Sequence, residues 1–370
     1  MNDRDGCIAL NLLSGIGYSR FQQLSEWFGA PGQVFNHSVE EYSKLHGFGA
    51  QLSERIAEFD PETALAAELE LAERGGVDII TLFDSRYPAV LRELQAPPLC
   101  LYVRGTLPEF PRKCVAVVGT RRLSAYGARM TERIAADAAA MGYTVVSGLA
   151  AGADTIAHSA VLKAGGITVA VIGAGLAHVH PKDNIPLARD IVEHGGAVIS
   201  EFPISLPPAR QNFPRRNRIV AGLCEATIVT EAGIDSGAMI TARLALENNR
   251  DLFALPGNVD NPAAKGCNTL IKEGIPLIER FEDAAAMLEK GLVLCPQSSA
   301  GADAPDNDAN SDMDEFTKRL WALLGEGELG FDELQSALEA ETGELLTALM
   351  KLELKMLIEL TPEQRYRRMV

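Results

Sequence analysis

The sequence predicts an α/β protein with a doubly wound parallel sheet at its centre, a helical domain before it and a winged-helix domain after it. Between residues 113 and 292, short apolar runs alternate with stretches of helical spacing, as in repeated β-α units. Residues 6–60 show helical spacing with two Gly-x-Gly turns. Residues 296–312 contain no large apolar side chain and separate the C-terminal residues from the rest.

Residues 1–75 are expected to form a helical domain of the helix-hairpin-helix (SAM-like) type. LSGIG at 13–17 and LHGFG at 45–49 both have the hydrophobic-Gly-hydrophobic-Gly pattern of such hairpins. Turns of this kind can present backbone N–H groups to a DNA phosphate. A structural role is favoured over DNA contact, but both remain open, because the flanking basic residues are few: Arg20, Lys44 and Arg55.

Residues 76–112 are expected to be a segment that connects the helical domain to the sheet. It mixes short apolar runs with turn residues and is rich in proline, with Pro88, Pro97, Pro98, Pro108 and Pro111.

Residues 113–292 are expected to form the parallel sheet with its covering helices. Six continuous apolar runs bounded by turn residues are typical of strands that are buried on both faces. The stretches 125–141 and 238–248 have helical spacing. In such sheets ligands bind at the carboxyl ends of the strands. The six predicted strands are 115–119, 144–148, 167–173, 197–200, 226–230 and 251–255.

Residues 293–312 are expected to be a flexible linker, because residues 296–312 have no large apolar side chain and cannot bury enough surface to order themselves. Residues 313–370 then show three amphipathic segments, at 316–324, 331–338 and 344–354. MLIEL and RYRR, separated by TPEQ, are expected to form a small hairpin. Three helices and a hairpin indicate a winged-helix domain.

The charge of the chain is unevenly distributed along the sequence. The formal net charge is −16, yet residues 111–220 contain 13 Lys and Arg against 7 Asp and Glu. Residues 296–370 contain 7 basic residues against 16 acidic ones. A locally basic region can bind a polyanion even when the whole protein is acidic.

The composition predicts a cytoplasmic protein without a membrane span. No run of about 18 apolar residues occurs. The N-terminal residues lack the pattern of a secretory signal. The cysteines have irregular spacing with no C-x-x-C pair, which favours reduced, buried thiols over disulfides or a zinc site. They are Cys7, Cys100, Cys114, Cys224, Cys267 and Cys295.

The first candidate for ligand contact directly follows the first predicted strand of the sheet. A glycine at this turn lets the backbone approach a phosphate, and the next helix offers free N–H groups. An arginine adds a charge-assisted contact. A plain strand-to-helix turn explains the pattern equally well. The residues singled out are Gly119, Thr120, Arg121, Arg122 and Ser124.

The second candidate is a basic segment, 210–218, with four arginines and one phenylalanine. No acidic residue lies between Phe202 and Cys224, whereas a solvated charged face normally mixes both signs. Arginine binds phosphates and an exposed Phe can stack on a base, which is the usual combination for single strands. Nucleic acid is therefore favoured over a structural or small-anion role. The residues singled out are Arg210, Phe213, Arg215, Arg216, Asn217 and Arg218.

A third group of small and basic residues is expected at the same edge of the sheet. SGAMITA at 236–242 opens a helix after the strand that ends at Thr230. The turns at 256–258 and 265–268 would complete the rim of a pocket, with Lys265 and Asn268 as its contacts.

No catalytic residue, metal site or cofactor is expected. The sequence has neither a complete G-x-G-x-x-G pattern nor a G-x-x-x-x-G-K-[ST] loop, so nucleotide hydrolysis and NAD chemistry lack their usual parts. The six histidines are not accompanied by a carboxylate pattern. Asp154 is expected to accept hydrogen bonds at a helix N-terminus.

The motifs of residues 147–271 together resemble the DprA (Smf) family. In order they read SGLAAGADTIAH, VIGAGLAHVHPKDN, ISEFP, RQNFPRRNRIVAGL, SGAMITARLALE and PGNVDNPAAKGCNTLI. The resemblance is strong over residues 80–290 and weak at both ends. It implies an extended Rossmann-like fold that binds single-stranded DNA and dimerises through that domain. It also implies that the protein loads the recombinase RecA during natural transformation.

The resemblance carries the family's DNA pocket to seven of the residues above, and less surely to Lys265 and Asn268. The seven are Gly119, Thr120, Arg121, Arg210, Phe213, Asn217 and Arg218. Three features depart from the family pattern. The family often has basic residues at the positions of Gly233, Ile234 and Asp235. It often has arginine and tyrosine at the positions of Ala151 and His180. The segment 344–354 is acidic, so the C-terminal domain is expected to contact protein.

Two other functions are possible on the sequence alone. An enzyme like the lysine-decarboxylase-like phosphoribohydrolases would use a P-G-G-x-G-T-x-x-E loop, but SGAMITA stands at the comparable place and no glutamate clearly fills the catalytic position. Alternatively, the N-terminal hairpins bind DNA and the sheet is only a scaffold. DNA binding by the sheet domain is the favoured hypothesis.

Overall fold

A computed structural model describes two compact units, within residues 1–297 and 298–370. The residues that the structure describes are 1–110, 113–289, 315–324, 329–338, 340, 345, 348–349, 352, 358–360 and 365–368.

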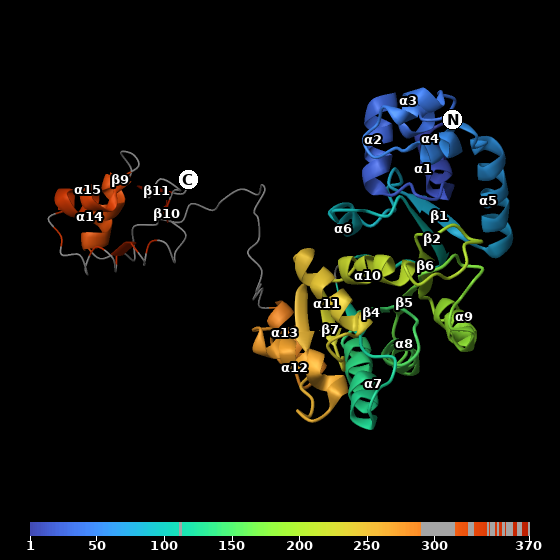
Figure 1. Cartoon of the computed structure of the whole chain (residues 1–370). Coiled ribbons are helices and arrows are strands. Elements are labelled where there is room, and N and C mark those ends of the chain that lie inside the picture. The colour runs from blue at the N-terminus through green and yellow to red at the C-terminus, as the bar shows by residue number, and fades with distance from the viewer. Residues whose placement is uncertain are drawn as a thin grey trace. The chain divides into compact units, whose positions relative to one another are not determined.

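An eight-stranded sheet forms the centre of the first unit (Figure 1). Its strand order is β1-β2-β6-β5-β4-β3-β7-β8, and β3 to β8 all pair in parallel. The prediction of a mixed α/β fold with a large parallel sheet is confirmed, and all six predicted strands are present. They are β3 (Cys114–Val118), β4 (Thr144–Ser147), β5 (Thr168–Val171), β6 (Ala197–Ser200), β7 (Ala226–Val229) and β8 (Asp251–Ala254).

Helices cover both faces of this sheet because alternate strand residues point to opposite sides. In β3, Val115 and Val117 pack into one core, whereas Ala116 and Val118 pack into another. The first core contains α7 (Ala125–Ala140), α8 (Ala153–Lys163) and α13 (Phe281–Glu289). The second is covered by α6 (Ala89–Arg92), α10 (Asn212–Gly222), α11 (Gly237–Glu247) and α12 (Lys265–Lys272). Helix α9 (Ile185–Glu193) contacts β5 and β6.

The segment 76–112 is part of the sheet and not only a connection. It contributes β1 (Asp78–Thr81) and β2 (Cys100–Gly105), which pair antiparallel with each other. Strand β2 also pairs antiparallel with β6, so the two strands extend one edge of the sheet. These strands were not predicted from the sequence, because both are short and the segment as a whole is rich in proline. The predicted domain boundaries around this segment stay predictions.

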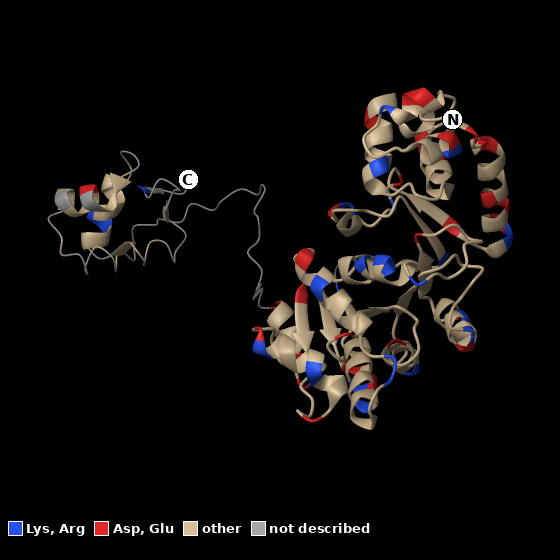
Figure 2. Ribbon diagram, viewed as in Figure 1, with Lys and Arg blue, Asp and Glu red and all other residues tan. Residues whose placement is uncertain are grey.

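Five helices precede the sheet and share a hydrophobic core with it. Leu10 and Leu65 belong to the same buried cluster as Ala170 of β5 and Val198 of β6. Acidic residues gather on α5 of this region (Figure 2). The assignment to the helix-hairpin-helix type stays a prediction. The helices are α1 (Asp3–Leu12), α2 (Tyr18–Phe28), α3 (Val39–Ser43), α4 (Ala50–Ala57) and α5 (Pro61–Gly75).

The two Gly-x-Gly turns of this region are held together by arginines. Arg20 donates hydrogen bonds to the carbonyl oxygens of Gly15 and Gly47, at 2.7 and 3.2 Å. Arg55 donates to the carbonyl oxygen of Ser14 at 2.8 Å. Two of the three basic residues that flank the turns therefore bind the turns themselves.

The second unit contains helices α14 and α15 and a three-stranded antiparallel sheet in the order β10-β11-β9. The two strands of the predicted hairpin pair with each other. The linker 293–312 and most of the segment 344–354 lie outside the described residues. The winged-helix assignment stays a prediction. The elements are α14 (Glu315–Leu323), β9 (Leu329–Gly330), α15 (Phe331–Leu338), β10 (Ile358–Leu360) and β11 (Arg365–Arg368).

Within the described ranges, no helix is both long and apolar enough to cross a membrane. Five cysteines are buried, and Cys295 lies outside the residues that the structure covers. Among the described side chains, no group of three or more His, Cys, Asp or Glu is arranged to hold a metal ion.

Candidate functional site

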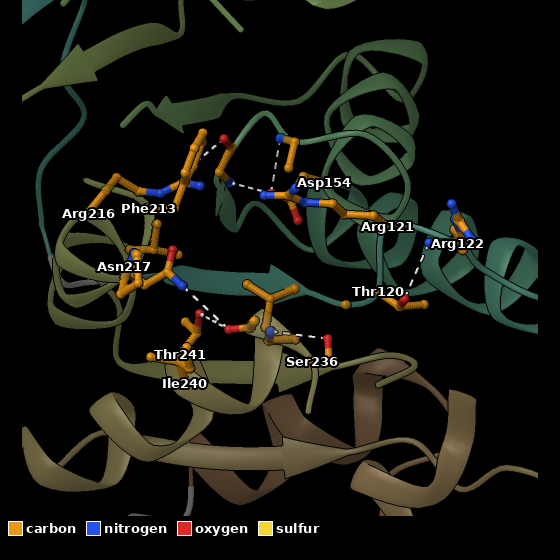
Figure 3. Close-up of a pocket in the computed structure, with 18 residues that line it drawn as sticks. Thr120, Arg121, Arg122, Asp154, Phe213, Arg216, Asn217, Ser236, Ile240 and Thr241 are labelled. Carbon is orange, nitrogen blue, oxygen red and sulfur yellow. Dashed lines mark hydrogen bonds between the residues drawn. The ribbon is translucent and has the colours of Figure 1, made fainter. Parts of the chain in front are cut away.

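A cavity of about 420 Å³ opens at the carboxyl ends of the parallel strands, where the direction of winding reverses between β3 and β7. Open α/β sheets bind ligands at this switch point. The loop after β3, the first turn of α10 and the start of α11 line the cavity (Figure 3). Seven predicted site residues lie in the lining: Gly119, Thr120, Arg121, Arg122, Phe213, Arg216 and Asn217.

The loop after β3 is held by close backbone packing. A Cβ atom on Gly119 would lie 2.7 Å from the Cβ atom of Ala153. Gly152 has a φ of +88°, and a Cβ atom there would lie 2.6 Å from the carbonyl oxygen of Thr120. The N–H of Thr120 donates to the carbonyl oxygen of Glu231 at 2.7 Å. Only glycine permits this approach, so the loop has one defined position.

Ser124 is occupied by the fold and does not line the cavity. Its N–H and its hydroxyl each donate to the Glu231 carboxylate at 2.7 Å. Its Oγ accepts from the N–H of Gly127 and so caps α7. Glu231, which is buried two residues after the end of β7, was not recognised from the sequence. An acidic residue close to the end of a buried strand was its signal in the sequence.

Arg121 and Phe213 meet across the cavity. The Arg121 guanidinium carbon lies 5.4 Å from the centroid of the Phe213 ring, in cation–π contact. Arg121 is exposed and Phe213 is half-buried in the first turn of α10. The His180 ring, from the loop after β5, lies 6.4 Å from Phe213. Arg122 is also exposed, so both arginines of this loop are available to a ligand.

Arg216 lies in the floor of the cavity and is only 4% exposed. Its guanidinium donates to the carbonyl oxygens of Gly148 and Val171, which follow β4 and end β5. The pKa of Arg216 is lowered to about 10, mainly by burial, with Asp154 acting in the opposite direction and the nearby Arg121 cation adding to the lowering. The guanidinium stays charged at neutral pH and joins the ends of two strands.

Asp154 is the acidic partner in this floor. Its carboxylate accepts hydrogen bonds from the N–H groups of Gly148 and Ala150, at 3.1 and 3.2 Å. These donors lie in the loop before α8 and not at the helix N-terminus, where the sequence had placed them. Burial raises the pKa of Asp154, whereas the Arg216 cation and the backbone N–H groups act in the opposite direction. The floor therefore combines a buried cation and a buried carboxyl group, with Arg121 above them.

Two further arginines of the basic segment contact the carboxylate of Glu201, which lies just before the acid-free stretch between Phe202 and Cys224. Arg218 contacts Glu201 at 2.5 Å, and its side chain is 14% exposed. Arg215 contacts the same carboxylate at 3.2 Å but is half exposed. Glu201 directly follows β6 and is buried. The stretch without acidic residues begins at Phe202, one residue after Glu201, so the sequence showed no acidic partner for these arginines.

The remaining predicted residues are divided between the cavity and its surroundings. Asn217 lines the cavity and donates to the carbonyl oxygen of Gly237 at 3.4 Å. Arg210 and Lys265 are exposed outside the lining. Asn268 binds both backbone groups of Gly257 and holds that turn. The lining also includes Ser236, Ile240 and Thr241, which belong to the predicted SGAMITA stretch.

A model of the family described as DNA recombination-mediator protein A matches residues 78–289 of the chain. The chain belongs to this family, the DprA/Smf family. Protein Smf from Escherichia coli (strain K12) is 36% identical over 346 residues, which cover 90% of this chain and 91% of that protein. DNA processing protein DprA from Streptococcus pneumoniae is 41% identical over 56% of this chain and 73% of that protein.

Two solved DprA structures also resemble the chain. The X-ray structure of DprA from Streptococcus pneumoniae has a TM-score of 0.65 and 33% identity, covering 76% of this chain and 97% of that one. The DprA structure from Helicobacter pylori has a TM-score of 0.52 and 30% identity, covering 58% of this chain and 97% of that one. The latter is described as giving insight into a single-stranded DNA binding mode.

Proposed function

We propose that this DprA/Smf family member binds single-stranded DNA at the cavity beside β3 and thereby serves DNA processing. One observation carries the proposal: Arg121 and Phe213 meet at 5.4 Å over a cavity at the switch point of the sheet. A cation next to an aromatic ring suits a chain of phosphates and unpaired bases. The single-stranded DNA binding mode described for the Helicobacter pylori DprA supports the same ligand.

The proposed contacts divide the work between phosphates and bases. Arg121, Arg122 and Arg210 are exposed and provide phosphate contacts, with the Gly119–Thr120 backbone beside them. Phe213 provides a stacking surface, which needs a base whose face is free. A duplex hides the faces of its bases, so single strands are the preferred ligand.

The other predicted contact residues receive supporting or peripheral roles in this proposal. Arg216 and Arg218 are too buried to leave their carbonyl and carboxylate partners, and they position β4, β5 and α10. Ser124 and Asn268 hold turns next to the site. Arg215 and Lys265 are exposed enough to add outer phosphate contacts.

We further propose that the protein loads RecA recombinase on the bound strand, as a homodimer joined through the sheet domain, in the cytoplasm. The family description as a recombination mediator supports the first part. The homodimer is proposed from the resemblance to the family. We expect the protein to act by binding and not as an enzyme.

The binding proposal is tested by fluorescence anisotropy with labelled single-stranded and duplex oligonucleotides. Phe213→Ala should weaken binding to single strands about tenfold or more, because a stacked base contributes about 1–3 kcal/mol. Arg133→Ala, an exposed arginine that pairs with Asp137 on α7, is the control and should bind like the unchanged protein. Equal affinity for duplex and single strand, or no effect of Phe213→Ala, would contradict the proposal.

The RecA proposal has a separate test. RecA ATP hydrolysis is followed on single strands that are already covered by single-strand-binding protein. The chain should shorten the lag before hydrolysis, and Phe213→Ala should restore it. An unchanged lag with a protein that binds DNA normally would limit the function to DNA binding. Sedimentation of the full chain tests the proposed dimer.

A further inference from the structure

The segment 201–206, between β6 and α10, contacts the N-terminal helices. The side-chain amide of Asn11 on α1 donates to the carbonyl oxygen of Glu201 at 3.2 Å. The N–H of Ile204 donates to the Glu68 carboxylate of α5 at 2.8 Å. Glu68 and Ile204 are both buried. A carboxylate is seldom buried without a specific partner, so this contact defines the position of the segment.

The same segment binds α10 on its other side. The Glu201 carboxylate contacts Arg215 and Arg218, which lie on α10 two and five residues after Phe213. The Arg215 guanidinium also lies 5.4 Å from the centroid of the Phe202 ring. Two arginines of the helix that carries Phe213 are therefore anchored to the segment.

The segment also holds the loop that follows β5. The N–H groups of Gly175 and Ala177 donate to the carbonyl oxygens of Leu206 and Ile204, at 2.8 and 3.1 Å. A Cβ atom on Gly175 would lie 2.1 Å from the carbonyl oxygen of Pro203, so only glycine fits. This loop continues to His180, which lies beside Phe213.

We propose that the segment 201–206 is the element through which the N-terminal helices position α10 and the 174–180 loop at the candidate DNA site. Glu68 and Glu201 are the positioning residues. The expected effect on DNA binding rests on the proposed function. The mechanical link, by which the N-terminal helices position α10 through this segment, rests only on the contacts described above. The N-terminal helices then influence DNA binding without contacting DNA.

The charge of the N-terminal helices supports an indirect role. Residues 1–75 contain twelve acidic and five basic residues, and the acidic ones are prominent on α5 (Figure 2). Such a surface repels phosphates. Glu68, an acidic residue of α5, is instead turned inward toward the segment. An effect of these helices on DNA affinity therefore has to pass through the protein.

The mechanical link is tested by hydrogen exchange on the full chain without DNA. Glu68→Met keeps the length of the side chain but removes the acceptor for the Ile204 N–H. It should speed exchange about threefold or more in the segment and in α10, because both lose an anchor. Glu70→Met, at an exposed position two residues along α5, is the matched control and should leave both unchanged. Faster exchange confined to α5 would overturn the inference.

The DNA consequence is tested by a double-mutant cycle on oligonucleotide binding with Glu201→Gln and Phe213→Ala. Each single variant should weaken binding about tenfold. The double variant should weaken binding only about 20-fold, and not the roughly 100-fold of two independent effects, because both changes act through the position of Phe213. Glu193→Gln, an exposed position on α9, is the control. A purely structural role of Glu201 would lower stability but leave the two effects multiplicative, which would overturn the inference.

The two proposals fail in different ways. If Phe213→Ala binds DNA normally while Glu68→Met loosens α10, the DNA site is wrong and the mechanical link stands. If Phe213→Ala weakens binding while the cycle is multiplicative and α10 is unaffected by Glu68→Met, the site stands and the positioning role is overturned.

Discussion

The loop after β3 and the helix α10 both carry clustered arginines at the same edge of the sheet, but they use them differently. In the loop, Arg121 and Arg122 are exposed beside the cavity. In α10, Arg216 is buried on backbone carbonyls and Arg218 on Glu201. The arginines of the loop are thus available to a ligand, whereas most arginines of the helix bind other groups of the protein.

The difference follows from the positions of the residues on their elements. A helix turns its side chains in all directions, so residues 215, 216 and 218 cannot all face the cavity. A loop of exposed residues at a strand end has no such restriction. An arginine cluster in a sequence therefore indicates a possible anion site, but only the neighbouring elements decide which guanidinium groups remain available.

The largest expected effect comes from Arg216→Met. This change leaves Asp154 buried without its cation and two carbonyl groups without their donor. The free energy of unfolding should fall by about 2–6 kcal/mol, because each buried acceptor that loses its donor costs about 1–3 kcal/mol. Urea denaturation followed by circular dichroism measures it. Arg121→Met should lose less than about 0.5 kcal/mol. Equal stability of the two variants would remove the contrast between helix and loop.

The next largest effect is the loss of DNA affinity expected from Arg121→Glu. Loss of a charge-assisted contact and gain of repulsion should weaken binding to single strands about 100-fold at low salt, with unchanged stability. Anisotropy with a labelled oligonucleotide measures this. Arg133→Glu makes the same change of charge on α7 and should cost no more than about twofold. If both variants lose affinity equally, only the overall charge matters and the loop has no special role.

A smaller effect is expected on acid stability from His158, a buried residue of α8. The pKa of His158 is lowered to about 3, mainly by burial and also by the nearby Arg216 cation. The unfolded chain binds a proton near pH 6.5, but the native state does so only near pH 3. The stability contribution is therefore complete above pH 6.5 and is lost as the pH falls toward 3, by about 1.4 kcal/mol per pH unit.

His158→Leu should remove this pH dependence. Urea denaturation of both proteins between pH 7 and pH 5 isolates the effect of His158, because Asp154 is present in both. Parallel pH profiles would show that His158 is not held neutral beside Arg216.

The smallest effect concerns the salt dependence of binding, and it separates loop from helix most directly. If only the exposed Arg121, Arg122, Arg210, Arg215 and Lys265 neutralise phosphates, the logarithm of the affinity should fall with the logarithm of salt concentration with a slope of about −3.5. If the buried Arg216 and Arg218 also contacted phosphates, the slope would be about −5. Titrations at four sodium chloride concentrations distinguish the two values, and the steeper one would show that α10 releases its arginines on binding.

Much of the fold was predictable because its signals are local. The six parallel strands are continuous apolar runs between turn residues, and helices α7 and α11 have clear periodicity, so each was found within a few residues. Strands β1 and β2 were missed because their runs are short and belong to a proline-rich segment that suggested a connection. Their place was determined by pairing with β6, a contact between distant parts of the chain.

The candidate site was predictable only in part. Gly119, Arg121 and Phe213 were recognised from residue type and from their positions after a strand or in a basic segment, and they do line one cavity. Glu231 and Glu201 were not recognised, although they hold Ser124 and Arg218. Each is a single acidic residue after a strand, and nothing in its neighbours along the chain indicates its distant partner.

By itself, the sequence determined the alternation of strands and helices and the clustering of arginines with a phenylalanine near strand ends. These properties depend on neighbours along the chain, so they can be read without a structure. Only the tertiary structure decided which arginines face the cavity and which bind Glu201 or backbone carbonyls. The physical reason is that an arginine is no longer available to a ligand once a distant carboxylate or carbonyl group lies within hydrogen-bond distance of it. The packing of the whole sheet determines which of these groups come that close.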